Sequence, residues 1–97
     1  MKESFHKSLN LIIHQPVRLQ IMTFLHLSKQ AKFSDLKNEL KVTDGNLGSH
    51  LEKLEKEKYI KIKKKFVLKK PTSIISITEK GENELVKYLE TIKKLIS

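Results

Sequence analysis

The chain is 97 residues long, enough for one modest hydrophobic core and therefore for a single domain over residues 1–97. Its formal net charge is +9, and residues 59–77 hold six lysines and no acidic residue, which favours contact with a polyanion over a merely solvated surface. The absence of cysteine excludes disulfides and thiolate metal sites, and with no secretory signal and no apolar run of roughly 20 residues we expect a cytoplasmic protein with no membrane partner.

The first predicted element is a helix over about residues 3–13. Its apolar residues recur at i, i+4, i+7 and i+8, which places them on one face. They are Phe5, Leu9, Ile12 and Ile13. Pro16 interrupts this pattern and suits the first turn of a new helix, because its missing N–H costs nothing there. A second helix is therefore predicted over about residues 16–28, where we expect Arg18, the only arginine, to pair with an acidic residue.

Two further helices are predicted around a tight turn. A short extended piece over residues 31–33 leads into a helix over about 35–40. Thr43 is a favoured N-cap residue, and Asp44 follows it in the first turn, where the helix dipole favours a carboxylate. The helix that begins here is predicted over about residues 44–57. Its buried face consists of Leu47, Leu51 and Leu54.

The pattern then changes from helical to period two. Residues 59–66 alternate largely between apolar residues and lysine, as in a half-buried strand, and residues 73–77 form a second short β-rich run. The two runs predict an antiparallel hairpin whose tip lies at residues 69–72. Thr78 caps a last helix, predicted over about residues 79–96. Its apolar stripe consists of Leu85, Leu89, Ile92 and Ile96.

This order of elements predicts an α+β, mainly helical fold: a winged helix-turn-helix with a two-stranded wing and flanking N- and C-terminal helices. In this plan the second helix of the helix-turn-helix enters the major groove of duplex DNA, and the hairpin reaches the backbone or minor groove. The candidate residues on that helix are Thr43, Asp44, Gly45, Asn46, Ser49, His50 and Lys53. Those on the wing are Lys63, Lys64, Lys65, Lys69 and Lys70.

The side chains suggest different roles in DNA binding. Asn46 can form a bidentate bond with an adenine edge, Ser49 and His50 can reach bases or phosphates, and Thr43 and Lys53 suit phosphates. The wing lysines should supply affinity rather than discrimination, because lysine is a flexible point charge. Structural readings stay open: Asn46 can satisfy the first helical turn, glycines can serve helix packing, and a lysine-rich strand edge deters aggregation.

Four runs of the sequence resemble successive landmarks of small MarR/ArsR-like winged-helix transcription regulators of the compact prokaryotic branch. They are PVRLQI at 16–21, FSDLK at 33–37, TDGNLGSHLEKLE at 43–55 and TEKG at 78–81. The resemblance implies dimeric, sequence-selective DNA binding, usually in repression. Departures from the family are the missing cysteines, the scattered histidines and the short flanks. They argue against metal sensing and leave a small-molecule effector unidentified.

The terminal stripes predict a homodimer. Together they exceed what one small core should absorb, and a two-fold interface between helices 3–13 and 79–96 would bury the remainder and match a palindromic site. The alternative is that both helices only complete the monomer core. The predicted interface consists of Phe5, Leu9, Ile12, Ile13, Leu85, Leu89, Ile92 and Ile96.

Other classes of function are less well supported by the sequence. It contains no glycine-rich phosphate loop, cysteine nucleophile or HExxH motif, so we expect neither an enzyme nor a cofactor. A winged-helix module that binds another protein or RNA is the alternative. RNA binding usually brings exposed aromatic residues, whereas only six aromatics are present here and most fall at predicted core positions.

Overall fold

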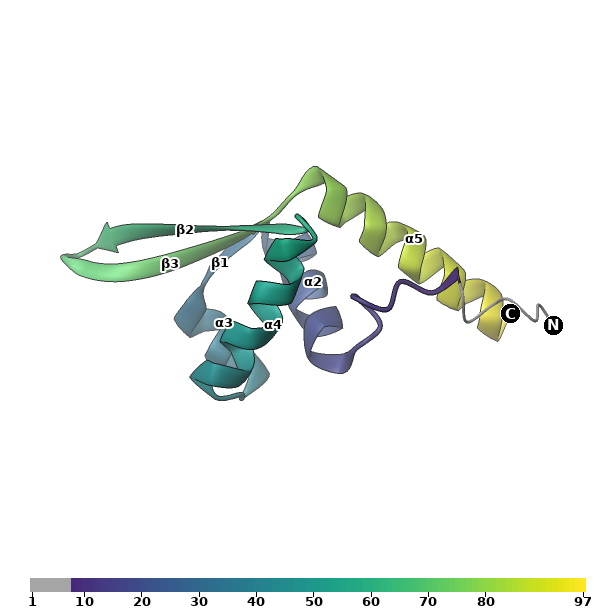
Figure 1. The fold of residues 1–97 in the computed structure, drawn as a ribbon, viewed down its shortest axis with the longest axis horizontal. Helices are drawn as coiled ribbons and strands as arrows, with labels where there is room; N and C mark the ends of the chain where they lie inside the picture. Colours follow the sequence, from purple (N-terminus) through teal and green to yellow (C-terminus); the bar gives the residue numbers. More distant parts are fainter. Residues whose placement is uncertain (1–7) are drawn as a thin grey trace.

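The computed structural model describes residues 8–97, and Figure 1 shows a helical body from which a long hairpin projects. The elements are α2 (Pro16–Ser28), β1 (Gln30–Lys32), α3 (Phe33–Leu40), α4 (Asp44–Lys56), β2 (Ile60–Val67), β3 (Lys70–Ile77) and α5 (Glu79–Ile96). This is the predicted α+β, mainly helical winged helix-turn-helix, and its helices after Pro16 begin and end close to the predicted residues. The sheet has three strands in the order β1-β3-β2, so β1 adds a strand to the expected two.

The helix predicted over residues 3–13 is wrong over residues 9–13, which form a bend and turns, whereas Ser8 is helical. The Asn10 side chain is the physical reason. Its Oδ1 accepts the backbone N–H groups of Ile12 and Ile13, at 2.9 and 3.1 Å, and its Nδ2 donates to the Tyr59 hydroxyl and to Glu84. A side chain that bonds its own neighbouring backbone competes with helix formation. Phe5, the first residue of the predicted stripe, lies outside the described residues.

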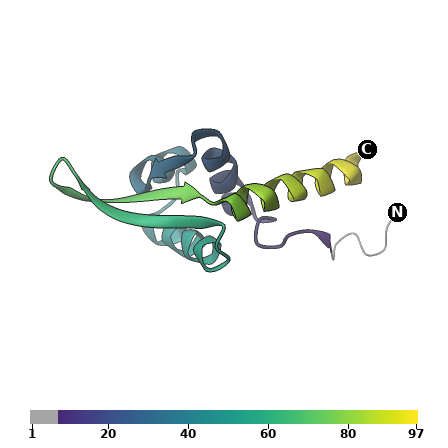
Figure 2. The ribbon, with the colours of Figure 1, turned by 90° about the horizontal axis from the view of Figure 1, so that it is seen from above.

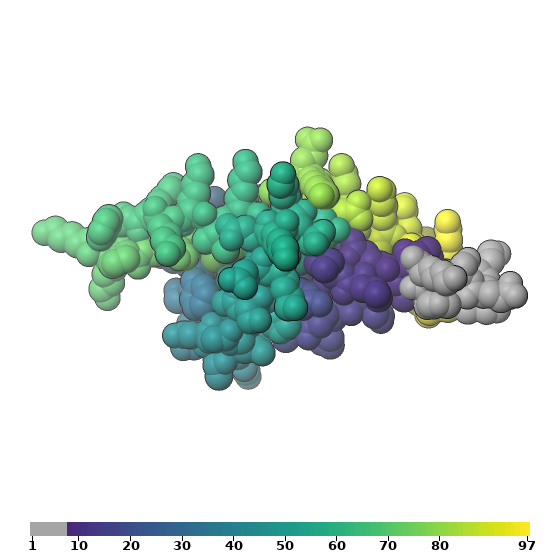
Figure 3. All heavy atoms as spheres, in the orientation of Figure 1, coloured from purple at the N-terminus to yellow at the C-terminus, as the bar shows by residue number. Residues whose placement is uncertain are grey.

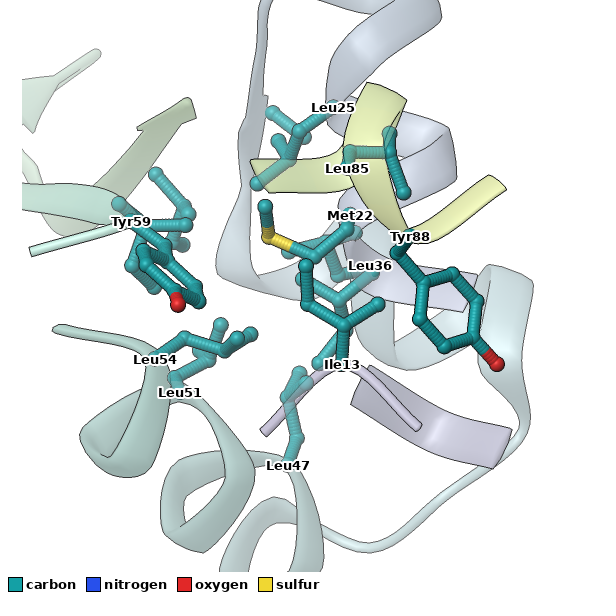
Figure 4. Close-up of a cluster of buried hydrophobic side chains, with 14 residues drawn as sticks. Ile13, Met22, Leu25, Leu36, Leu47, Leu51, Leu54, Tyr59, Leu85 and Tyr88 are labelled. Atoms are coloured by element: carbon teal, nitrogen blue, oxygen red, sulfur yellow. The ribbon is translucent and has the colours of Figure 1, made fainter. Parts of the chain in front are cut away.

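The buried residues form one hydrophobic cluster to which every described helix and strand contributes. Figure 4 shows the α4 side chains Leu47, Leu51 and Leu54 pointing into this cluster below Met22 of α2, with Leu85 of α5 on the far side of Met22. Ile13 also lies in this cluster and is fully buried, although it is in a turn. Because α2 packs against α3, α4 and α5, it joins the helix-turn-helix and α5 in this one cluster.

The hairpin turn differs from the predicted tip at 69–72. Val67 pairs with Lys70, so only Leu68 and Lys69 lie between the strands, and both have positive φ values of 52° and 66°. This is the geometry of a two-residue type I′ turn. Pro71 is therefore in β3, opposite Phe66. Since β1 pairs only with residues 74–76, Pro71 lies where β3 has a free edge, the position in a sheet where a missing N–H is tolerated.

The last helix begins as predicted, with the Thr78 hydroxyl accepting the N–H of Gly81 at 2.9 Å. Glu82 joins α5 to α2 through His26, at 2.5 Å, and through Lys29, at 2.8 Å. Hydrogen bonds from these two partners lower the pKa of the Glu82 carboxyl. Beyond this contact α5 runs away from the body on the side opposite the hairpin (Figures 1 and 2).

Candidate nucleic-acid interface

Helices α3 and α4 form the helix-turn-helix, and the turn between them is built from three residues. Lys41 ends α3 in the left-handed conformation, with φ 55°, and Thr43 caps α4 by accepting the N–H of Asn46 at 3.1 Å. The Lys37 ammonium lies 2.8 Å from the Asp44 carboxylate, which bridges the two helices. Thr43 and Asp44, predicted as DNA contacts, therefore have structural roles in holding the second helix at a fixed angle to the first.

The surface of α4 opposite its leucines is polar and open. Gly45, Asn46, Ser49 and Lys53 are exposed there. Asn46 does not satisfy the first turn with its side chain, because Thr43 provides the cap, and its amide group has no hydrogen bond within residues 8–97. A Cβ added at Gly45 would meet no atom within 4 Å, so packing does not require glycine at this position. Both features leave this face of α4 available to a partner.

His50 differs from its neighbours because its ring is held by another helix. The Arg18 Nη1 lies 3.1 Å from His50 Nδ1, and Arg18 Nε donates to the Ile12 carbonyl at 2.6 Å. An arginine can only donate, so Nδ1 must accept, and the ring proton is placed on Nε2. Burial, followed by the nearby charges of Arg18 and Lys53, lowers the pKa of His50 and favours this neutral ring.

The expectation for Arg18 was wrong. Its guanidinium forms no ion pair with an acidic residue in the part of the chain that the structure describes. It instead connects the turn at residues 10–13 to α4. No sequence pattern indicated this role, because Arg18 and His50 are 32 residues apart.

The wing lysines are all exposed, but they do not share one face of the hairpin. Side chains alternate along a strand, so Lys64 lies on the face of Ile60 and Ile62, which carries the core, whereas Lys63 and Lys65 lie on the opposite face. Lys70 pairs with Val67 on that opposite face, and Lys69 is in the turn. Figure 3 shows the hairpin as a narrow arm with protruding side chains. The register places positive charge on both faces of this arm.

Two exposed apolar residues on this arm were missed. Phe66 and Leu68 are 79% and 91% exposed, at the end of β2 and in the turn. The alternation over residues 59–66 predicts a strand that includes Phe66, and it predicts nothing for Leu68. Their exposure depends on how far the hairpin extends beyond the core, which periodicity does not reveal.

The predicted dimer stripe divides into a buried and an exposed part. Ile13 and Leu85 are buried in the monomer core and have no surface left for a partner, and Leu9, Ile12 and Ile92 are partly buried against it. Leu89 and Ile96 remain open, at 48% and 77% exposed. Three further apolar residues that the stripe omitted are also exposed at this end of the molecule or in the turn before α2. They are Leu11, Val86 and Leu95.

Within residues 8–97, no three or more histidine, aspartate or glutamate side chains are grouped so that they could hold a metal ion. None of the helices over the same residues is long and apolar enough to span a membrane.

The fold and this surface define a helix-turn-helix protein with a basic wing, and comparison with known proteins identifies its family. Residues 17–96 match the family model described as a winged helix DNA-binding domain. The chain therefore belongs to the family of winged helix DNA-binding domains. At the level of the fold, the resemblance to MarR-like and ArsR-like winged-helix regulators is also confirmed.

Individual relatives agree with this assignment. The chain is similar to a transcriptional regulator homologue from Pyrococcus horikoshii OT3, with 35% identity and a TM-score of 0.86 over 97% of this chain and 91% of that one. It is 36% identical over 84 residues to an uncharacterized protein of Methanocaldococcus jannaschii, covering 87% of this chain and 91% of the relative. A MarR mutant from E. coli, solved in complex with operator DNA, shares the fold at 14% identity and a TM-score of 0.73, over 91% of this chain and 62% of that one.

Proposed function

We propose that the chain is a transcription regulator that binds duplex DNA as a homodimer, with α4 in the major groove and the hairpin on the neighbouring backbone. The observation that carries the proposal is the open polar face of α4 beside a basic wing, in a chain that belongs to a family of DNA-binding domains. The structure of a MarR mutant with operator DNA supports the docking mode at the level of the fold. Repression, the commoner outcome in such regulators, completes the proposal.

Within this proposal, three residues of α4 read bases and one contacts phosphate. Asn46 presents an unpaired amide that matches the N6 and N7 edge of adenine. His50, with its proton on Nε2, donates a hydrogen bond and so favours an acceptor such as guanine N7 or O6, while Ser49 suits either base edge. Lys53 meets phosphate. We assign Asp44 to the bridge with Lys37 instead, because an unpaired carboxylate would repel the DNA backbone.

The proposal makes the chain a binding protein and not an enzyme. Its family is one of DNA-binding domains, and the surface described above offers recognition rather than a nucleophile and base. Binding to chromosomal DNA would place the protein in the cytoplasm of a prokaryotic cell. The proposal also treats residues 1–97 as one domain, and the single hydrophobic cluster supports this.

The test is selection of duplexes from a random pool, followed by affinity measurements with the selected site. Asn46→Ala should weaken binding to that site by roughly 1–3 kcal/mol and binding to random duplex by less. Asn83→Ala, an exposed asparagine on α5, is the matched control and should change neither affinity. Failure of the wild type to enrich any duplex, or equal losses on both duplexes for Asn46→Ala, would contradict the proposal or its assignment of base contacts.

A further inference from the structure

The tip of the wing combines two features that a folded protein normally avoids. Leu68 has a φ of 52°, a left-handed conformation that is rare for residues other than glycine and asparagine. The same side chain is 91% exposed, and Phe66, two residues earlier, is 79% exposed. Neither of these exposed side chains belongs to the packed hydrophobic core. A type I′ turn of Asn-Gly would be less strained and more soluble, so an exposed leucine here points to a partner that binds it.

The surroundings of this tip indicate the chemistry of the partner. The neighbouring side chains Lys64, Lys65, Lys69 and Lys70 are exposed, and the hairpin has no acidic residue. The lysines of this tip favour contact with a polyanion. The apolar side chains of Leu68 and Phe66, however, form no favourable interaction with phosphate. Duplex DNA offers both surfaces, because its minor groove is lined by phosphates and floored by stacked bases, between which apolar side chains can insert.

The length of the wing fits this placement. Ile75 is fully buried and pairs with Ile62, so the free part of β2 begins there and continues for five residues to Val67. At about 3.4 Å per residue, this part spans about 17 Å. A major groove and the next minor groove are separated by half of a helical turn of about 34 Å, which is also about 17 Å. The tip can thus reach the minor groove next to the major groove that α4 occupies.

We propose that Leu68, flanked by Phe66, is an apolar wedge that enters the minor groove and opens one base step, which bends the DNA towards the major groove. The proposal rests on the proposed function and deepens it. The lysines hold the backbone on both sides while the wedge unstacks the bases. Easily unstacked steps such as TA should then be favoured at the contacted position, although the wing forms no hydrogen bond with a base.

The experiment compares the wild type with Leu68→Asn on the duplex selected by the wild type. Asparagine relieves the turn, so the variant should melt at the same or a higher temperature and keep all wing charges. It should nevertheless bind roughly tenfold more weakly. Fluorescence transfer between labels on the two duplex ends should report a bend for the wild type and a smaller one for the variant. An aminopurine base at the contacted step should brighten only with the wild type.

Three further measurements make the result decisive. Phe66→Thr keeps a strand-forming residue and should also reduce the bend, whereas Leu27→Gln, at a similarly exposed leucine of α2, should not. Replacing the TA step by AA should weaken wild-type binding more than binding of Leu68→Asn. If the wild type binds its duplex without bending it, or if Leu68→Asn binds and bends equally, the wedge is overturned while DNA binding stands. If the wild type binds no duplex, the proposed function itself fails.

Discussion

Two glycines of the chain differ in what surrounds them, and the difference separates folding from function. A Cβ at Gly81 would lie 2.2 Å from the Tyr59 carbonyl oxygen, because the start of α5 passes directly over the end of the chain segment that follows α4. At Gly45 the same atom would meet nothing within 4 Å. Only the first glycine is explained by the fold.

We expect opposite effects from alanine at these two positions. Gly81→Ala should lower the free energy of unfolding by about 1–3 kcal/mol, since backbone must move to admit the methyl group. Gly45→Ala should raise it by up to about 1 kcal/mol through helix propensity, yet weaken duplex binding if the DNA approaches the α4 backbone here. Denaturant titration and binding isotherms measure the two effects. If Gly45→Ala binds the duplex as tightly as the wild type, the DNA does not approach the α4 backbone closely at this position.

His50 should make stability depend on pH. Its pKa lies below the ordinary value of 6.5 in the folded chain, mainly through burial and then through Arg18 and Lys53, so the unfolded chain binds a proton more readily. The wild type should therefore lose stability as pH falls below about 6.5, with no such loss above it. His50→Gln should lack this component when melting is compared at about pH 7.5 and pH 5.

Glu82 does not confuse the comparison of the wild type with His50→Gln. Glu82 also has a lowered pKa, but it loses its stabilising contribution only as pH falls below its ordinary value of 4.5, and it is present in both proteins. An equal loss of melting temperature for the wild type and His50→Gln between about pH 7.5 and pH 5 would contradict a lowered pKa of His50 in the folded chain.

At the scale of elements, the proposed function divides DNA recognition between α4 and the wing. The α4 surface presents distinct polar groups at fixed positions, whereas the hairpin presents flexible charges on both of its faces. Discrimination among sequences should therefore depend on α4, and the electrostatic part of affinity should depend on the wing lysines.

Salt dependence separates the two contributions. With about six phosphates neutralised per dimer, the logarithm of the binding constant should fall with the logarithm of salt concentration at a slope of roughly −5. Lys64→Ala, Lys65→Ala and Lys70→Ala together should flatten the slope and weaken binding to all duplexes alike. The matched control removes three charges from α5 with Lys87→Ala, Lys93→Ala and Lys94→Ala, and it should leave the slope nearly unchanged. Equal flattening by both triple variants would mean that net charge, and not the wing, sets the affinity.

At the scale of the whole molecule, α5 leaves its apolar surface on the side away from the wing. A second copy that covers Leu89, Ile96 and their neighbours would leave both α4 helices and both wings free. Two recognition helices about 34 Å apart would then read an inverted repeat, which one small chain cannot do.

We expect sedimentation at micromolar concentration to give about 23 kDa, twice the chain mass of 11.3 kDa. Leu89→Glu with Ile96→Lys should give folded monomers with reduced affinity for the inverted repeat, because both positions are exposed and charge there spares the core. Ile92 is not suitable for this test, since it packs against the core. Leu27→Glu serves as the control for an exposed leucine elsewhere. A monomeric wild type with full preference for a palindrome would contradict the interface.

The sequence by itself determined most helices and the two main strands, because these depend on local signals. Thr43 and Thr78 mark helix starts, the Leu47 to Leu54 spacing marks a buried face, and the lysine alternation marks a strand. The class of protein followed from the order of these elements. The positions of the residues proposed to contact DNA followed from the faces that the leucines left open.

Tertiary structure alone decided the features that join distant parts of the chain. The stripe before Pro16 has a helical period, but Asn10 finds Tyr59 and Glu84 in the folded chain and stabilises a turn there instead. The register Val67 with Lys70 moved the turn to Leu68, and the reach of Arg18 to His50 fixed a ring in α4. Periodicity reports which face of an element is apolar, but only packing decides whether that face meets the core, a partner or solvent.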